Sequence, residues 1–221
     1  MFKAILFDLD NTLIDFVQMK RKASKAAINA MIEKGLELTH DEALEKLEEL
    51  YRQEGWEDQT IFQKFLKQTN GDLDYKLLAY GILAYRQAKE LCMEPYPNTV
   101  STLMQLKDKG IKLAIVSDAP KLQAWLRLCQ LKLDDFFEAI VALDDTGQLK
   151  PSALPFNAAI KELKVKPSEC LMIGDDSERD IKGATDLGIK TALAKYGLFK
   201  EPQYKADYEI NSVEEILEII K

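Results

Sequence analysis

Short runs of consecutive apolar residues, each ending in a turn or in polar residues, recur along this 221-residue chain. Apolar runs without alternation are typical of strands that are buried on both faces, as in a parallel sheet covered by helices. The runs begin near residues 4, 111, 137, 170, 189 and 206, with the sequences AILFDLD, IKLAIVSDA, FEAIVALDD, CLMIGDD, IKTALAKYG and ADYEINS. They predict six strands, of which the last is short and edge-like.

Apolar positions at helical spacing lie between the later runs. They predict helices over residues 98–110, 121–133, 152–165, 179–188 and 212–221. The apolar face of the first would comprise Val100, Leu103, Met104 and Leu106, and that of the third Phe156, Ala159, Ile160 and Leu163. Strand and helix therefore alternate from about residue 97 to the end. This alternation predicts an α/β fold with a doubly wound, mostly parallel, Rossmann-like sheet.

The segment after the first strand has a different pattern, which is helical throughout. Helices are predicted over residues 20–35, 39–53, 60–68 and 74–91. Thr39 and Glu42 have the spacing of a capping box, as do Ser212 and Glu215 near the end of the chain. We therefore predict a catalytic core made of residues 1–15 and 95–221, with an α-helical cap domain, residues 16–94, inserted after the first strand.

Composition narrows the class of protein. Apolar residues make up 47% and charged residues 30% of the chain, which is typical of a globular protein. The net charge of −7 argues against a nucleic-acid partner. No apolar run reaches the ~20 residues that span a membrane, and the N-terminus does not resemble a signal peptide. Three widely spaced cysteines favour a reducing compartment. We expect a soluble cytoplasmic protein without a membrane partner.

Polar side chains of chemical interest follow the predicted strands at their carboxyl ends. Asp8 and Asp10 follow the first strand, Ser117 the second, Lys150 the third and Asp175 the fourth. Ligands of open α/β sheets bind beyond these strand ends, so parallel neighbouring strands would bring the groups together. Converging carboxylates repel unless a positive charge joins them. Asp8, Asp10 and Asp175 offer hard oxygen ligands, which predict a Mg²⁺ site. The single histidine argues against a histidine-rich zinc site and against a Ser-His-Asp triad.

Four ordered motifs carry a resemblance to a known family. DLDNT, the Ser117 of IVSDA, the Lys150 of LKPS and GDDSERD resemble the motifs of the haloacid dehalogenase superfamily, in its phosphatase branch with a helical cap. The resemblance covers nearly the whole chain. It implies that Asp8 attacks phosphorus and forms a phosphoaspartate, and that Asp10 serves as general acid and then as general base. It also implies that Asp10 binds the metal through its backbone carbonyl.

The resemblance implies supporting roles for the remaining motif residues. Phosphate would be held by Ser117, Asp118, Lys150 and Asn11. Asp176, Asp180 and Thr12 would position the metal ligands without binding the metal themselves. Two residues depart from the usual pattern. Asp118 stands where relatives often have asparagine, and Asp176 where they often have serine or another small residue.

Several functions fit this pattern. The first is a Mg²⁺-dependent phosphatase acting on a small phosphorylated metabolite. A 2-haloacid dehalogenase would use the same nucleophile, but such enzymes usually lack the second aspartate and need no metal. A phosphomutase and a non-catalytic binding protein of the same fold are further alternatives. Aromatic residues of the helical segment have the spacing of a core but could also line a substrate pocket: Trp56, Phe62, Phe65, Tyr80 and Tyr85. The sequence does not indicate the oligomeric state.

Overall fold

The computed structural model describes residues 2–220. Within this range, six strands form one parallel sheet in the order β3-β2-β1-β4-β5-β6. Each strand lies in one of the predicted apolar runs: β1 (Ala4–Phe7), β2 (Lys112–Val116), β3 (Ala139–Val141), β4 (Cys170–Gly174), β5 (Lys190–Ala194) and β6 (Tyr208–Ile210). The predicted doubly wound α/β fold is confirmed, and the sheet is entirely parallel.

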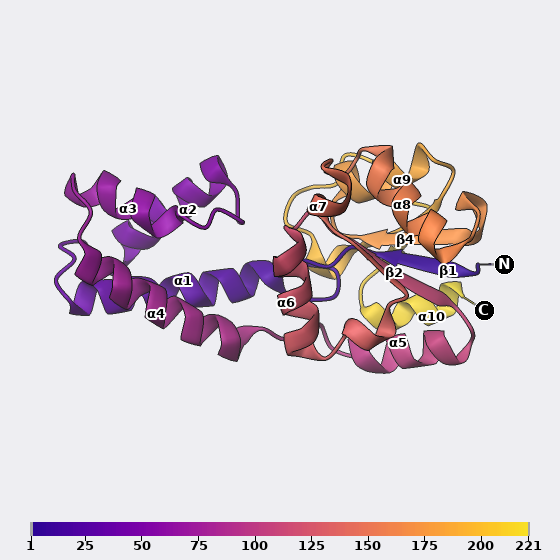
Figure 1. Cartoon of the computed structure of the whole chain (residues 1–221), viewed down its shortest axis with the longest axis horizontal. Coiled ribbons are helices and arrows are strands. Elements are labelled where there is room, and N and C mark those ends of the chain that lie inside the picture. Colours follow the sequence, from indigo (N-terminus) through magenta and orange to yellow (C-terminus); the bar gives the residue numbers. More distant parts are fainter. Residues whose placement is uncertain (1, 221) are drawn as a thin grey trace. The chain divides into compact units, whose positions relative to one another are not determined.

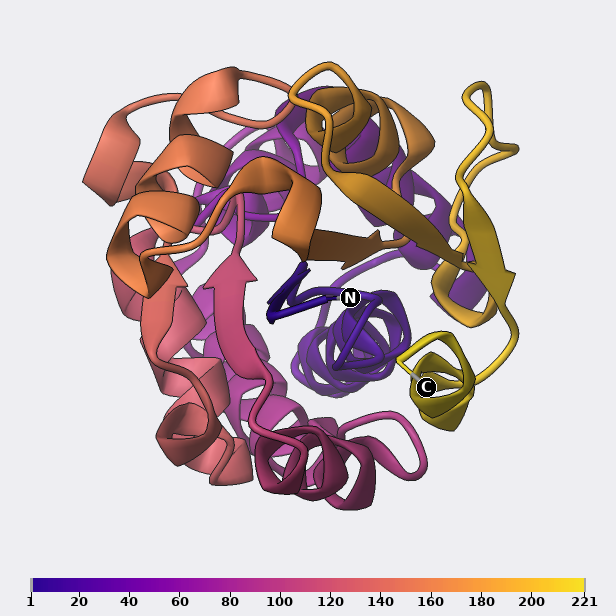
Figure 2. The same cartoon turned by 90° about the vertical axis from the view of Figure 1, so that its right-hand side faces the viewer.

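Helices cover both faces of this sheet (Figure 1). The helices α8 and α9 lie on one face, and α5 and α10 lie on the other, as the view along the sheet also shows (Figure 2). The α-helices of this part of the chain are α5 (Thr99–Asp108), α6 (Lys121–Leu131), α7 (Leu143–Thr146), α8 (Ala153–Leu163), α9 (Gly183–Thr185) and α10 (Ile216–Ile219). The shorter turns are η1 (Asp134–Phe136), η2 (Pro167–Glu169), the π-helical η3 (Ser177–Lys182), η4 (Lys195–Gly197) and η5 (Val213–Glu215).

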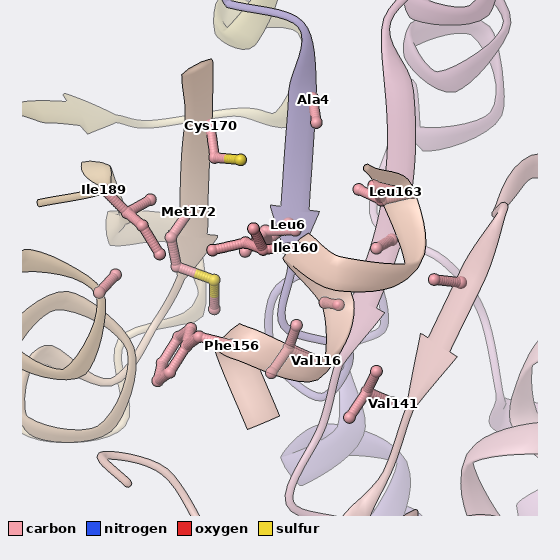
Figure 3. Packing of buried hydrophobic residues seen from close by; sticks show 14 residues of the cluster. Ala4, Leu6, Val116, Val141, Phe156, Ile160, Leu163, Cys170, Met172 and Ile189 are labelled. Atoms are coloured by element: carbon pink, nitrogen blue, oxygen red, sulfur yellow. The ribbon is translucent and has the colours of Figure 1, made fainter. Parts of the chain in front are cut away.

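Side chains of alternate strand residues form the core beneath α8 (Figure 3). Leu6, Val116 and Met172, from three adjacent strands, belong to the same buried cluster as Phe156 and Ile160 of α8. The intervening strand residues are also fully buried, because helices cover the opposite face as well. Burial on both faces explains why the strand sequences are continuously apolar instead of alternating.

Two local predictions at the helices differ from the structure. On α5, Val100 and Met104 are 41% and 55% exposed, while the small side chains of Thr99 and Thr102 are buried beside Leu103 and Leu106. The buried stripe follows i, i+3, i+4, i+7 spacing, but threonines fill half of it.

The two predicted capping boxes also have different outcomes. The box of α2 is confirmed, because Thr39 Oγ1 accepts from the Glu42 N–H, and the Glu42 carboxylate accepts from the Thr39 N–H. The box at Ser212 is wrong. The Glu215 carboxylate accepts from the Asn211 N–H instead, and residues 213–215 form a 3₁₀ turn.

The chain divides into two compact units, Met1–Phe16 with Glu94–Lys221, and Val17–Met93. The second unit is helical, as predicted, and contains most of α1 (Phe16–Glu33), together with α2 (His40–Glu54), α3 (Ile61–Asn70) and α4 (Tyr75–Cys92). These helices surround a hydrophobic core of their own. Within residues 2–220, none of the helices combines the length and the apolar character that a membrane span requires. The use of the helical unit as a cap and the cytoplasmic location stay predictions.

Candidate active site

The register of the sheet determines which residues meet at its carboxyl edge. Phe7, the last residue of β1, pairs with Ile115 of β2 on one side and with Ile173 of β4 on the other. The Asp8 N–H continues the ladder by donating to the Ile173 carbonyl at 2.8 Å. Successive strands are added on one side of β1 as far as β3 and on its other side from β4 onward, and doubly wound folds bind ligands at such a switch in strand order. The aspartates that follow these two strands, Asp8 and Asp175, therefore lie at the ligand-binding position of the fold.

Three buried carboxylates gather at this point. Oxygen atoms of Asp8, Asp175 and Asp180 lie within 4.8 Å of one another. The third, Asp180, comes from η3 and is only 1% exposed. Burial, followed by the charges of Asp8 and Asp180, raises the pKa of Asp175. Burial likewise raises the pKa of Asp180, although the nearby Lys150 ammonium partly offsets this effect.

The Lys150 ammonium group lies against this carboxylate cluster. Its Nζ is 2.5 Å from Asp8 Oδ1, 2.7 Å from Asp180 Oδ1 and 2.8 Å from the carbonyl oxygen of Val116. Burial alone would lower the pKa of Lys150, but the charges of Asp180 and Asp8 outweigh it and raise the pKa. Lys150 is therefore a permanent positive charge beside Asp8.

Close packing at Gly174 holds Asp180 in place. A Cβ atom added at Gly174 would lie 2.2 Å from Asp180 Oδ2, which is far inside contact distance. Asp180 Oδ2 also accepts from the Asp176 N–H at 3.0 Å. The glycine that ends β4 thus leaves room for the third carboxylate to reach the cluster.

The Asp10 carboxylate lies in a different environment from the cluster. Asp10 Oδ2 accepts a hydrogen bond from Arg127 Nη1 of α6 at 2.7 Å. The sequence predictions did not single out Arg127. The available signal was a basic residue on the buried face of α6, between Ala124 and Leu128. Ligation of a metal by the backbone carbonyl of Asp10 stays a prediction.

Asp118 and Asp176 are not part of the carboxylate cluster, and both form ion pairs with Arg179. Asp118 Oδ1 accepts from the Lys150 N–H at 2.8 Å, and its Oδ2 lies 3.2 Å from Arg179 Nη1. Asp176 Oδ1 caps the first turn of η3, and its Oδ2 accepts from Arg179 Nε at 2.9 Å. Burial would raise the pKa of Asp176, but the Arg179 charge and hydrogen bonds lower it overall. Both departures from the family pattern therefore share one arginine, which sequence reasoning also missed.

Ser117, Thr12 and Asn11 lie next to Asp8 or on the adjoining loops. Ser117 is 3% exposed, and its Oγ accepts from the Ala119 N–H at 3.1 Å. Thr12 Oγ1 is 3.4 Å from Asp8 Oδ2. Asn11 has a left-handed backbone (φ 60°), and a Cβ atom added at Gly197 would lie 1.7 Å from its carbonyl oxygen. A larger residue than glycine at position 197 would therefore displace the loop that carries Asp10.

The carboxylate cluster fits a divalent cation. Asp8, Asp175 and Asp180 supply only oxygen donors, and their mutual repulsion would be relieved by a hard cation between them. Of the predicted metal residues, the structure brings together the carboxylates of Asp8 and Asp175. It adds Asp180, for which the family resemblance implies only a supporting position next to the metal ligands.

The helical unit has a cavity of its own, with a volume of about 310 Å³. Its lining includes Leu47, Tyr51 and Trp56, together with basic residues of α1. Of the aromatic residues considered for a pocket, Trp56 lines this cavity, stacked on Tyr51 with ring centroids 4.8 Å apart. Phe62 and Phe65 are buried in the core of the helical unit instead.

Comparison with known proteins gives concordant matches. Residues 5–194 match the family described as haloacid dehalogenase-like hydrolase. A glyceraldehyde 3-phosphate phosphatase of Methanocaldococcus jannaschii is 33% identical over 223 residues, covering 100% of this chain and 98% of that protein. A glyceraldehyde 3-phosphate phosphatase of Pyrococcus furiosus is 35% identical, covering 99% of this chain and 93% of that protein.

A solved structure agrees with these matches. The crystal structure of a HAD phosphatase from Thermococcus onnurineus has a TM-score of 0.70 and 30% sequence identity, covering 99% of this chain and 98% of that one. The order of the strands, the carboxylate cluster at their carboxyl edge and these similarities lead to one conclusion. The chain belongs to the haloacid dehalogenase-like hydrolases.

Proposed function

We propose that this protein is a Mg²⁺-dependent phosphatase that hydrolyses a small phosphorylated metabolite through a phosphoaspartate on Asp8. The observation that carries the proposal is the buried cluster of Asp8, Asp175 and Asp180 with the Lys150 ammonium against it. Such a site matches a phosphoryl group in charge, since a cation and an ammonium group can together neutralise its oxygens. The phosphatase names of the relatives support the same reaction class.

In the first step, a carboxylate oxygen of Asp8 attacks the phosphorus atom of the substrate. The bond between phosphorus and the leaving oxygen breaks, and Asp10 gives its proton to that oxygen, releasing an alcohol. Lys150, 2.5 Å from Asp8, balances negative charge on the carboxylate and on the transferring group. Ser117, Asn11 and the backbone near Asp118 hold the phosphate oxygens.

In the second step, water attacks the phosphorus atom of the phosphoaspartate. Asp10, now ionised, accepts the proton of the attacking water. The bond between phosphorus and the Asp8 oxygen breaks, which releases inorganic phosphate and restores both aspartates. When bound by Asp8, Asp175 and the backbone carbonyl of Asp10, Mg²⁺ supplies charge neutralisation for the phosphoryl oxygens. Asp180 fixes Lys150 and the Asp176 loop behind these ligands.

Glyceraldehyde 3-phosphate is the first substrate to test, because relatives that match almost the whole chain are named glyceraldehyde 3-phosphate phosphatases. It is a small phosphorylated metabolite, as the sequence analysis predicts. We propose that the helical unit serves as the cap domain predicted for residues 16–94 and supplies substrate selectivity.

The test is phosphate release from p-nitrophenyl phosphate and from a panel of phosphorylated metabolites that includes glyceraldehyde 3-phosphate, with and without Mg²⁺. Asp8→Asn is expected to reduce release to background, because the amide is not a nucleophile. Asp108→Asn is the matched control, since Asp108 is exposed and ends α5 near the amino ends of the strands. Radiolabel from a phosphorylated substrate should be trapped on acid-quenched parent protein and not on Asp8→Asn.

Three outcomes would contradict the proposal. Halide release from 2-chloropropionate without added metal would indicate a dehalogenase. Substantial turnover by the Asp8→Asn variant would show that Asp8 is not the nucleophile. Transfer of phosphate between sugar hydroxyls without net release would favour a phosphomutase.

A further inference from the structure

Arg127 is a buried arginine, and burying its charged side chain is energetically unfavourable unless the charge is paired. It is 1% exposed, and among residues 2–220 it is the largest of the fully buried side chains. Buried charges destabilise a fold unless they are paired and hydrogen-bonded. Arg127 Nη1 donates to Asp10 Oδ2 at 2.7 Å, and its guanidinium carbon lies 4.3 Å from the centroid of the Phe16 ring. One face of the guanidinium is thus held by an aromatic ring, and its edge by the carboxylate of Asp10.

The pattern of α6 indicates that this burial is specific. The apolar side chains Leu122 and Leu126 of the same helix are 69% and 50% exposed, while Arg127 is inside. Hydrophobic burial alone would favour the opposite rotation of the helix. The helix therefore presents a guanidinium to the loop after β1 and leaves two leucines in solvent.

We propose that Arg127 is the positioning residue of Asp10, holding its carboxyl group in the orientation from which it transfers protons to the leaving oxygen and from water. This inference rests on the proposed phosphatase function, in which Asp10 is the general acid and base. The guanidinium donates to Oδ2, so the proton that Asp10 gives to the leaving oxygen is carried on Oδ1. The carboxylates of Asp8 and Asp175 belong instead to the cluster of three, where Asp8 pairs with Lys150.

A positioning role for Arg127 has a consequence that a purely structural salt bridge would not have. Protonation of the leaving oxygen matters greatly when phenolate leaves phenyl phosphate, and little when p-nitrophenolate leaves p-nitrophenyl phosphate. General acid catalysis contributes about 10²–10⁴-fold. Loss of the Asp10 orientation should therefore reduce kcat/KM for phenyl phosphate far more than for p-nitrophenyl phosphate. A general loss of folded protein would reduce both equally.

The experiment compares kcat/KM of these two substrates for Arg127→Met, Arg127→Lys and the parent protein. For Arg127→Met we expect a loss of roughly a hundredfold with phenyl phosphate and roughly tenfold or less with p-nitrophenyl phosphate. Arg127→Lys keeps the charge without the fixed guanidinium geometry and should give an intermediate ratio. Leu128→Ala is the control, because it removes buried packing from the same helix. It should lower Tm and leave the ratio of the two substrates unchanged.

A double-mutant cycle with Asp10→Asn closes the test. In the Asp10→Asn background, Arg127→Met should not change the substrate ratio further. An active Arg127 variant with the parent's substrate ratio would overturn the positioning role, as would a gain of activity. If Arg127→Met does not fold, the Arg127→Lys variant decides. A ratio of kcat/KM for the two substrates equal to that of the parent would overturn the positioning role. Parent protein that hydrolyses neither aryl phosphate would overturn the proposed function itself, and this inference with it.

Discussion

Replacing Lys150 by methionine removes the positive charge that pairs with two carboxylates of the buried cluster. The methionine side chain keeps an unbranched stem but cannot pair with Asp8 or Asp180, which the Lys150 ammonium contacts at 2.5 and 2.7 Å. It also leaves the carbonyl oxygen of Val116 without its hydrogen bond from Nζ. The variant therefore isolates the contribution of one buried cation to the free energy of unfolding.

The size of the effect follows from this geometry. Removing one partner of a buried ion pair costs about 3–5 kcal/mol, because the other charge remains buried and unpaired. Since Lys150 faces two carboxylates, we expect a loss of about 4–5 kcal/mol for the metal-free protein near neutral pH. Protonation of a carboxyl group in the variant limits the loss. Lowering the pH should recover about 1.4 kcal/mol per pH unit for each proton taken up.

The direction of the pH dependence comes from the shifted pKa values. Lys150 has a raised pKa in the folded state, so its contribution is complete below the ~10.4 of the unfolded chain and constant from pH 5 to 8. Asp175 has a raised pKa, so the unfolded chain loses its proton first as the pH rises above ~3.9. Stability from this group therefore falls with rising pH. Without Lys150 the carboxyl pKa rises further, and the fall extends to higher pH.

Urea denaturation followed by circular dichroism, in EDTA at about pH 5 and pH 7.5, measures the difference between variant and parent. Taking this difference cancels the titration of the groups that Lys150 does not affect. Lys161→Met is the matched control, since Lys161 is exposed on α8. A loss below about 1 kcal/mol at the higher pH, or a loss that does not shrink at the lower pH, would refute the reasoning.

Three further changes have definite expected results. Gly174→Ala should cost about 1–3 kcal/mol and most of the phosphatase activity, because the new Cβ would lie 2.2 Å from Asp180 Oδ2; unchanged Tm and kcat would contradict this. Thr39→Ala should cost ~1 kcal/mol in urea denaturation through loss of the α2 capping box, and an unaltered midpoint would show that the box contributes nothing. Mg²⁺ at a hundredfold excess over its Kd should stabilise the parent by about 2.7 kcal/mol in thermal unfolding and should not stabilise Asp175→Asn, whereas equal effects on both proteins would place the cation elsewhere.

The strands and most helices could be predicted from the sequence. A strand that is buried on two faces has a continuous run of apolar residues, and a helix that is buried on one face has apolar residues at helical spacing. The face of α8 that contains Phe156 is an example, and all four residues predicted for that face are buried. The pattern failed on α5, where the buried stripe includes Thr99 and Thr102. Small threonine side chains fit against a sheet, and a pattern of apolar residues does not register them.

The candidate site was predictable only as far as strand ends determine it. Asp8 and Asp175 follow neighbouring strands, so their proximity follows from the topology. The approach of Asp180 depends on the π-helical geometry of η3 and on the missing side chain of Gly174, which the spacing of charges does not reveal. The pairing of Asp10 with Arg127 joins a loop to a helix more than a hundred residues later, and depends on how α6 is rotated.

The position of β1 between β2 and β4 has a consequence for synthesis of the chain on the ribosome. The first strand to be made has both its edges paired only when translation has reached the fourth, Cys170–Gly174. Until then, a nascent chain exposes one unpaired edge of a fully apolar strand and holds Asp8 without the carboxylates of Asp175 and Asp180. Lys150 is translated before Asp175 and Asp180, so the counter-charge is already present when the last two carboxylates arrive.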